Sequence, residues 1–191
     1  MNTKLDQFES ALFKESKEVF LDIIEKFGNE EIYSMCLFNS GDSWNYILPS
    51  FATKAGLRQV ASKYKESEYY QEKSIETLER DLKWNPCDSP RHEMYVNALS
   101  KSEGYLRKVV LIMNEYWDDG REREYWRIHE KLVSICINCL QKLENDDVFI
   151  KLKRQSFVLN LLNGDQTEEE RLERAEQLNP IDVFLQYKIE L

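Results

Sequence analysis

The sequence predicts an α+β fold, in which several helices flank a small, mostly antiparallel sheet of about four strands. Three observations predict it. Residues 31–49 form an apolar run, a turn cluster and a second apolar run, as is typical of a β-hairpin. Long segments with apolar residues at three- and four-residue spacing precede and follow this hairpin. No repeat or linker divides the 191 residues, so residues 1–191 are expected to form a single domain.

The first helix and the hairpin are the clearest elements. Residues 3–27 predict an amphipathic helix, and Gly28 favours its end because glycine tolerates a left-handed cap. The apolar stripe of this helix comprises Leu5, Phe8, Leu12, Val19, Ile23 and Phe27. The first hairpin strand, residues 31–38, is nearly continuous in apolar residues, which indicates burial on both faces. The second strand is predicted over residues 43–49, with Pro49 ending its hydrogen-bond donation.

The middle of the chain predicts a helix and a further strand. Thr53 is a suitable N-cap for a helix with an inward face of Leu57, Val60, Ala61 and Tyr64. Residues 65–76 are polar and are expected to form a helix tail or a surface loop. Residues 77–84 alternate apolar and polar side chains, which predicts a third strand. The strongest loop signal of the chain follows at residues 85–90.

The second half is predicted to be mainly helical. A helix either starts at Ser89 and Pro90 or restarts after Ser100, and ends before residues 118–120. Residues 121–143 predict a long helix, and residues 156–162 predict a fourth strand. A capping box between Thr167 and Glu170 opens a short helix, and residues 181–191 form a last helical segment.

The charge balance bears on partners and location. The formal net charge is −9, which opposes non-specific binding of nucleic acid and suits a basic protein partner, although solubility also accounts for it. No segment approaches the run of about 18 apolar residues that a membrane helix needs. The N-terminus lacks the apolar region of a signal peptide. We therefore expect a cytoplasmic protein with no membrane or nucleic-acid partner.

The cysteines and histidines do not form a recognisable catalytic or metal site. Cys136 and Cys139 form a C-x-x-C pair with His129 on one helix face, but a zinc site would need a fourth ligand. Reduced structural thiols are favoured, and metal binding by these three residues stays an open alternative. His92 and His129 are the only histidines, and no nucleophile motif accompanies them. No catalytic residue and no cofactor is predicted.

Two other features could bind ligands or partners. The turn at residues 163–167 leads into a helix start that could hold an anion, but it lacks a glycine-rich fingerprint and a phosphate-binding lysine. Aromatic and arginine side chains near turns and helix ends could form a protein-binding hot spot. The candidate partner-binding surface consists of Trp84, Trp117, Arg121, Arg123 and Trp126.

Three segments together resemble the bacterial family known as domain of unknown function 4303. They are residues 31–38 with 44–50 and 56–57, the segment Leu82-Lys83-Trp84-Asn85-Pro86, and Leu178-Asn179-Pro180. Ser89 stands where relatives tend to carry a further tryptophan. The resemblance implies no established activity and no catalytic residue. It does imply kinship with proteins thought to include immunity-type partners of bacterial toxins.

Two functions follow as hypotheses. The first is a cytoplasmic, non-enzymatic protein-binding module, in one form an immunity-type protein that neutralises a basic toxin by binding it. The alternative is an enzyme of unknown reaction, with a pocket beside the sheet that uses His92 or His129 and nearby carboxylates. The sequence does not identify the partner or the oligomeric state.

Overall fold

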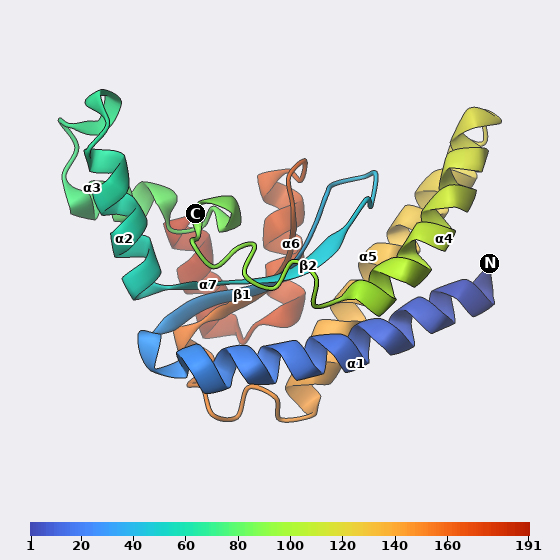
Figure 1. The fold of residues 1–191 in the computed structure, drawn as a ribbon, viewed down its shortest axis with the longest axis horizontal. Helices are drawn as coiled ribbons and strands as arrows, with labels where there is room; N and C mark the ends of the chain where they lie inside the picture. The colour runs from blue at the N-terminus through green and yellow to red at the C-terminus, as the bar shows by residue number, and fades with distance from the viewer.

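A mixed three-stranded sheet with the order β2-β1-β3 lies at the centre of the fold. The structure is a computed structural model that describes the backbone of residues 1–191 and every side chain except that of Gln155. The elements are α1 Asn2–Phe27, β1 Ile32–Asn39, β2 Ile47–Thr53, α2 Lys54–Lys65, α3 Ile75–Leu82, α4 Ser100–Asp118, α5 Glu122–Asn145, β3 Val158–Asn163, α6 Glu168–Leu178 and α7 Ile181–Glu190. The α2–α3 and α4–α5 pairs rise as two arms at opposite ends of the molecule, and α1 runs beneath them (Figure 1).

The sheet differs from the predicted one. β1 pairs antiparallel with β2, from Ile32 opposite Thr53 to Asn39 opposite Ile47. On its other side β1 pairs in parallel with β3, from Ser34 opposite Val158. The predicted α+β class is confirmed, but the four mostly antiparallel strands are not, because there are three strands in a mixed sheet.

The predicted third strand, residues 77–84, is wrong because the helix α3 occupies most of this segment. Ser74 caps α3 by accepting a hydrogen bond from the backbone N–H of Thr77. Leu78 and Leu82 lie four residues apart, a spacing that satisfies both the strand period of two and the helix period of 3.6. In so short a segment the alternation of apolar and polar residues cannot distinguish a strand from a helix. The N-cap hydrogen bond of Ser74 favours the helix.

The second hairpin strand is displaced toward the C-terminus. It was predicted over residues 43–49, but β2 begins at Ile47 and continues through Pro49 to Thr53. The connecting loop contains Gly41 and Trp44 at positive φ, and it turns the Trp44 side chain into the core. Pro49 does not end the strand, because β2 is an edge strand and an edge tolerates a missing N–H.

The core lies on both faces of the sheet. On one face, Met35, Leu37, Phe51, Leu159 and Leu161 pack with apolar residues of α1, α4 and α5. On the other face, Cys36, Phe38, Leu48 and Leu162 form a second cluster. Val158 packs with α6 and α7. Five of the six residues predicted for the apolar stripe of the first helix are buried, and the sixth, Phe27, packs against the core.

Most of the remaining helix predictions are confirmed. The predicted helix over residues 121–143 is α5, and the capping box of Thr167 and Glu170 opens α6 with both reciprocal hydrogen bonds present. Residues 90–99 form turns, so the helix starts at Ser100 and not at Pro90. None of the described helices is both long and apolar enough to span a membrane.

The four cysteines differ in accessibility, which gives a first testable prediction. Cys36, Cys136 and Cys139 are buried free thiols, and Cys87 is exposed. Burial raises the pKa of Cys36 and Cys139 to about 12 and also raises that of Cys136. We expect a thiol reagent to modify one thiol in the native protein and all four after denaturation. Cys87→Ser should remove the native reaction, and rapid modification of a second thiol would contradict the structure.

Candidate functional site

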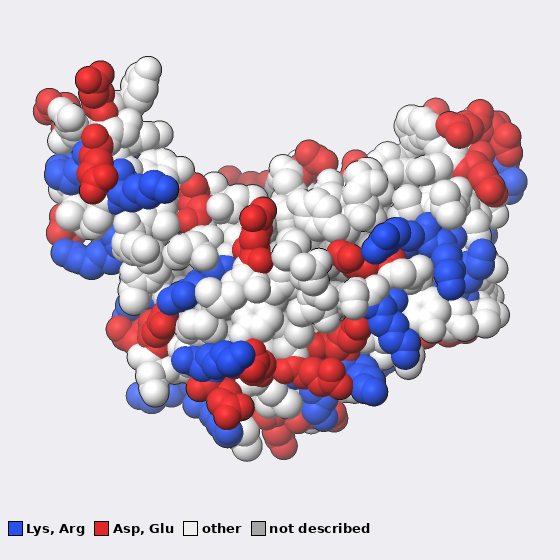
Figure 2. Space-filling view, in the orientation of Figure 1, with Lys and Arg blue, Asp and Glu red and all other residues white. Residues whose placement is uncertain are grey.

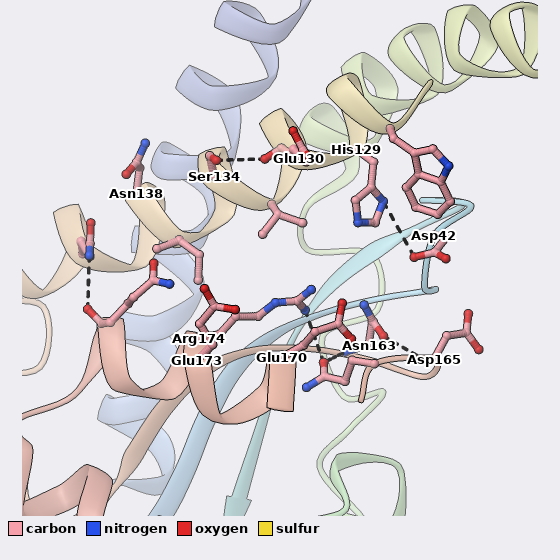
Figure 3. A pocket seen from close by; sticks show the side chains of 16 residues that line it. Asp42, His129, Glu130, Ser134, Asn138, Asn163, Asp165, Glu170, Glu173 and Arg174 are labelled. Atoms are coloured by element: carbon pink, nitrogen blue, oxygen red, sulfur yellow. Dashed lines mark hydrogen bonds and ion pairs between the residues drawn. The ribbon is translucent and has the colours of Figure 1, made fainter. Parts of the chain in front are cut away.

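A cleft of about 620 Å³ opens between α5 and α6, and its size lies in the range of small-molecule sites (Figure 3). The loops that follow β1 and β3 close one end of it, contributing Asp42, Asn163, Asp165 and Gln166. Because β1 and β3 are parallel, their carboxyl ends meet at this point. Ligands of open α/β sheets commonly bind outside the carboxyl ends of the strands.

The two loops meet at Gly41, where the backbone has a φ of +86°. A Cβ atom at this position would overlap the carboxylate of Asp165. Glycine is favoured here because it adopts the left-handed conformation without strain, and the Asp165 side chain would have to move to admit a Cβ atom. Gly41 and Asp165 therefore lie side by side where the two loops meet at the cleft.

His129 on α5 is one of two buried cationic or titratable groups in the cleft. Its Nδ1 accepts a hydrogen bond of 3.0 Å from Nε1 of Trp44, whose side chain is fully buried. An imidazole that accepts through Nδ1 carries its proton on Nε2. Burial lowers the pKa of His129, and the nearby Asp42 carboxylate opposes this in part. His129 is therefore a neutral hydrogen-bond donor at neutral pH.

Arg174 on α6 is the second buried group. It is only 7% exposed, and its Nη1 lies 3.4 Å from both the Leu161 carbonyl oxygen and Gln166 Oε1. Among the described side chains no carboxylate lies within 4.0 Å of its guanidinium nitrogens. Burial lowers the pKa of Arg174 and the charge of the Glu170 carboxylate opposes this in part, but arginine stays protonated in proteins. The cleft thus contains a buried cation without a contacting counterion.

The acidic residues around Arg174 are engaged elsewhere or solvated. The Glu170 carboxylate accepts hydrogen bonds from the backbone N–H of Thr167 at 2.8 Å and from its hydroxyl at 3.0 Å. These bonds hold it in the capping box, and the backbone bond lowers the pKa of Glu170. The remaining acids of the lining, Asp42, Glu130, Asp165 and Glu173, are exposed, and the side chain of Asp42 is 53% accessible.

Gln166 has a side-chain N–H donor that no described group of the protein accepts from. Its Oε1 accepts a hydrogen bond of 2.6 Å from the Asn163 backbone N–H, which fixes the side-chain amide. Its Nε2 is buried and has no hydrogen-bond partner among the described residues. The floor of the cleft therefore offers donors from Arg174, Gln166 and His129, and its mouth is acidic.

Four of the five residues predicted as a partner-binding surface come together at the outer end of α4 and α5. We name this set, Trp117, Arg121, Arg123 and Trp126, the α4–α5 tip. Trp117 and Trp126 are 51% and 40% exposed. Their rings each pack edge-on against Tyr125, with ring centroids 5.2 and 5.3 Å away. Trp126 also packs on His129 and lines the cleft, so the tip is continuous with the cleft.

The arginines of the α4–α5 tip differ in their contacts. The Arg121 guanidinium lies over the Tyr116 ring at 4.2 Å and forms a 3.2 Å ion pair with Glu124. Arg123 is exposed in the first turn of α5.

The fifth predicted residue, Trp84, lies apart from the tip. Its ring packs edge-on against Tyr187 of α7 at 4.7 Å and against Tyr33 of β1 at 5.5 Å. Trp84 is thus partly buried against a satellite core cluster that includes Val158, Ala175 and Phe184, and it does not lie on the α4–α5 tip.

The two histidines do not share a cleft. His92 packs edge-on against Phe38, whose cluster lies on the sheet face opposite to the main core. Its Nδ1 lies 3.0 Å from Ser50 Oγ, and its Nε2 lies 3.9 Å from Cys87 Sγ. Burial and nearby acids raise the pKa of the Cys87 thiol, so a reactive thiolate is disfavoured there. The structure therefore separates the two histidines, and only His129 lines the α5–α6 cleft with its carboxylates.

The described residues contain no group of three side chains arranged to hold a metal ion. His129 Nδ1 is occupied by Trp44, and Cys136 and Cys139 face the core. The sequence did not reveal Arg174, Gln166 and Trp44 as site residues. One signal was available: Arg174 lies four residues before Leu178 and next to Ala175, which places an arginine on the apolar face of α6.

Comparisons with known proteins give a family and no closer relative. Residues 13–180 match the model of the family described as Domain of unknown function (DUF4303). Neither a search of curated proteins nor a search of solved structures finds a match. The matched span contains the whole sheet, the cleft and the α4–α5 tip.

Proposed function

The chain belongs to the domain of unknown function 4303 family, and we propose that it is a cytoplasmic, non-enzymatic protein-binding module for a basic protein partner. A bacterial toxin neutralised by binding is the form of partner that the family resemblance suggests. The observation that carries the proposal is the α4–α5 tip, where two exposed tryptophans lie beside acidic residues.

The aromatic part of the tip has the properties of a binding anchor. Tryptophan and arginine are enriched among the residues that dominate binding energy at protein interfaces. Tyr125 packs against both Trp117 and Trp126, which restricts the two indole rings before any partner arrives. Restricting side chains in advance reduces the entropy lost on association.

The acidic residues beside the α4–α5 tip support a basic partner, although the tip itself carries Arg121 and Arg123. Asp118, Asp119 and Glu122 are exposed between Trp117 and Trp126 in the chain. Acidic side chains also gather at the free end of the other arm, where Glu66, Glu68 and Glu72 are exposed (Figure 2). With a net charge of −9, such a surface attracts a basic protein over a distance and orients it.

A salt-dependent capture experiment tests this proposal. Immobilised protein is expected to retain a basic protein from a lysate of the native cell, and the purified pair should associate more slowly as ionic strength rises. The combined variant Asp118→Asn, Asp119→Asn, Glu122→Gln should associate more slowly than wild type and depend less on salt. The matched control, Glu18→Gln, Glu25→Gln, Glu176→Gln, removes three exposed acids elsewhere and should retain more of the wild-type rate.

Two results would contradict the proposal. One is the failure to retain any protein at low and at physiological salt. The other is equal association by the variant of Asp118, Asp119 and Glu122 and by the control variant, since this would show that the acids beside the tip do not guide the partner.

A further inference from the structure

The α5–α6 cleft contains unused donors that the proposed protein-binding function does not explain. We propose that it binds a small amino carboxylate, a free molecule with one carboxylate and one ammonium group. The carboxylate binds Arg174, Gln166 and His129 on the floor, and the ammonium group binds the acidic mouth. This proposal stands independently of the protein partner.

The floor requires an acceptor. A buried cation without a contacting partner is unfavourable, and the guanidinium of Arg174 feels the charge of Glu170 but is contacted by no described carboxylate. Its side chain extends from α6 into the cleft, toward the side on which His129 lies (Figure 3). The planar guanidinium matches a carboxylate through two parallel hydrogen bonds. A ligand carboxylate would therefore supply a counterion in direct contact.

Gln166 and His129 provide donors beside the same guanidinium. Gln166 Nε2 is buried without a partner, and an unpaired buried donor is unfavourable. His129 and Arg174 line the same cleft, and the arginine charge lowers the pKa of His129 further. Because Trp44 donates to Nδ1, the Nε2–H of His129 stays available to a ligand oxygen. All three floor residues thus donate, and none of them requires a donor from the ligand.

The mouth selects against a simple anion. Asp42, Glu130, Asp165 and Glu173 line the cleft and are exposed, so an approaching phosphate or other multiply charged anion would be repelled. A cationic group on the ligand would reverse this interaction and pair with the acids. The combination of a donating floor and an acidic mouth therefore fits a zwitterion, and the cleft volume of about 620 Å³ accommodates a small molecule.

The test uses the ¹⁵N-labelled chain of residues 1–191 and pools of free L-amino acids, with acetate and ethylamine as probes of each half of the ligand. We expect saturable binding of at least one amino acid, observed as a shift of the Trp44 indole N–H signal, which is assigned by its absence in Trp44→Phe. Acetate and ethylamine alone should bind more weakly. Arg174→Gln should lower the affinity at least about tenfold, because it removes charge-assisted hydrogen bonds.

Gln166→Glu is the more selective variant. It retains an acceptor for the Asn163 backbone N–H, so the loop is expected to keep its structure. It also places a carboxylate beside Arg174, whose Nη1 lies 3.4 Å from Gln166 Oε1, and so supplies an internal counterion. This variant should fold at least as stably as wild type and bind the amino acid at least about tenfold more weakly. Glu176→Gln, exposed on the same helix, should bind as wild type does.

Three outcomes would overturn the proposal. They are the absence of saturable binding for every amino acid pool at millimolar concentrations, unchanged affinity in Gln166→Glu, and binding of peptides but not of free amino acids. The last result would assign the floor to the end of a protein chain. A folded Gln166→Glu variant keeps the proposal testable even if Arg174→Gln fails to fold.

Discussion

Replacing Trp44 with alanine is expected to lower the free energy of unfolding by about 4 kcal/mol. Trp44 is the largest of the fully buried side chains, so its removal leaves a large cavity in the main core. The change also removes the indole donor and leaves His129 Nδ1 without a hydrogen bond. This loss accounts for about 1 kcal/mol of the expected decrease. Urea denaturation followed by far-ultraviolet circular dichroism measures the effect without relying on tryptophan fluorescence.

Trp117→Ala is the matched control for this prediction. Its side chain is 51% exposed, so the same substitution is expected to cost less than about 1 kcal/mol. Trp44→Phe should fall between the two, because it retains most of the ring volume and loses the hydrogen bond. Equal destabilisation by Trp44→Ala and Trp117→Ala would show that the loop after β1 does not hold Trp44 in the core.

Replacing Asn179 with alanine is expected to lower the free energy of unfolding by about 3 kcal/mol. The Asn179 amide lies along the outer edge of β3, where Nδ2 donates to the Leu159 carbonyl at 2.8 Å and Oδ1 accepts from the Leu159 N–H at 2.8 Å. It further bonds the Ala175 carbonyl and Arg154. One side chain thus pairs with the outward-facing N–H and C=O of Leu159, as a fourth strand beside β3 would. Without it, two polar groups of a fully buried residue lose their partners.

Hydrogen exchange provides the specific measurement for Asn179. The Leu159 amide should be protected in wild type and should exchange much faster in Asn179→Ala, relative to the amides that pair β1 with β2. Asn179→Asp keeps the acceptor and loses both donor bonds, so its stability should be lowered as well. Asn138→Ala is the control, because this asparagine is exposed on α5. Unchanged protection of Leu159 in Asn179→Ala would contradict the edge-capping role.

The hydrogen bonds of Asn179 also explain one of the segments on which the family resemblance rests. Leu178 is buried in the main core, Asn179 satisfies β3, and Pro180 precedes α7. In the segment Leu82–Pro86, Trp84 packs on Tyr187 and the Asn85 side chain accepts a hydrogen bond from the Cys87 backbone N–H. Both segments thus have structural roles near the sheet, and neither contributes to the cleft floor.

The sequence predicts those elements whose signal is local. The long apolar stripes of α1 and α5 and the capping box of α6 are repeated or paired features that can be read over a few turns. The parallel pairing of β3 with β1 could not be predicted, since the chain between these two strands contains β2 and four α-helices. The start of β2 was predicted too early in the chain, because Trp44 has a positive φ and belongs to the loop that precedes the strand.

The same distinction applies to the candidate site. The α4–α5 tip joins two neighbouring helix ends, so residues 117–126 are close in sequence as well as in space. Trp84 was misplaced because its contacts with Tyr33 and Tyr187 come from distant parts of the chain. The cleft floor was missed for a similar reason, as Arg174, Gln166 and His129 come together only when α6 packs beside α5.

The most direct test of the proposed function is the affinity of the captured basic partner for a tip variant. Trp117→Ala combined with Trp126→Ala should weaken binding at least about a hundredfold, since truncation of an anchor residue typically costs 2 kcal/mol or more. Tyr69→Ala, an aromatic residue 92% exposed on the other arm, is the matched control and should change the affinity less than about threefold. Wild-type affinity in the double tip variant would contradict the assignment of the α4–α5 tip as the binding surface.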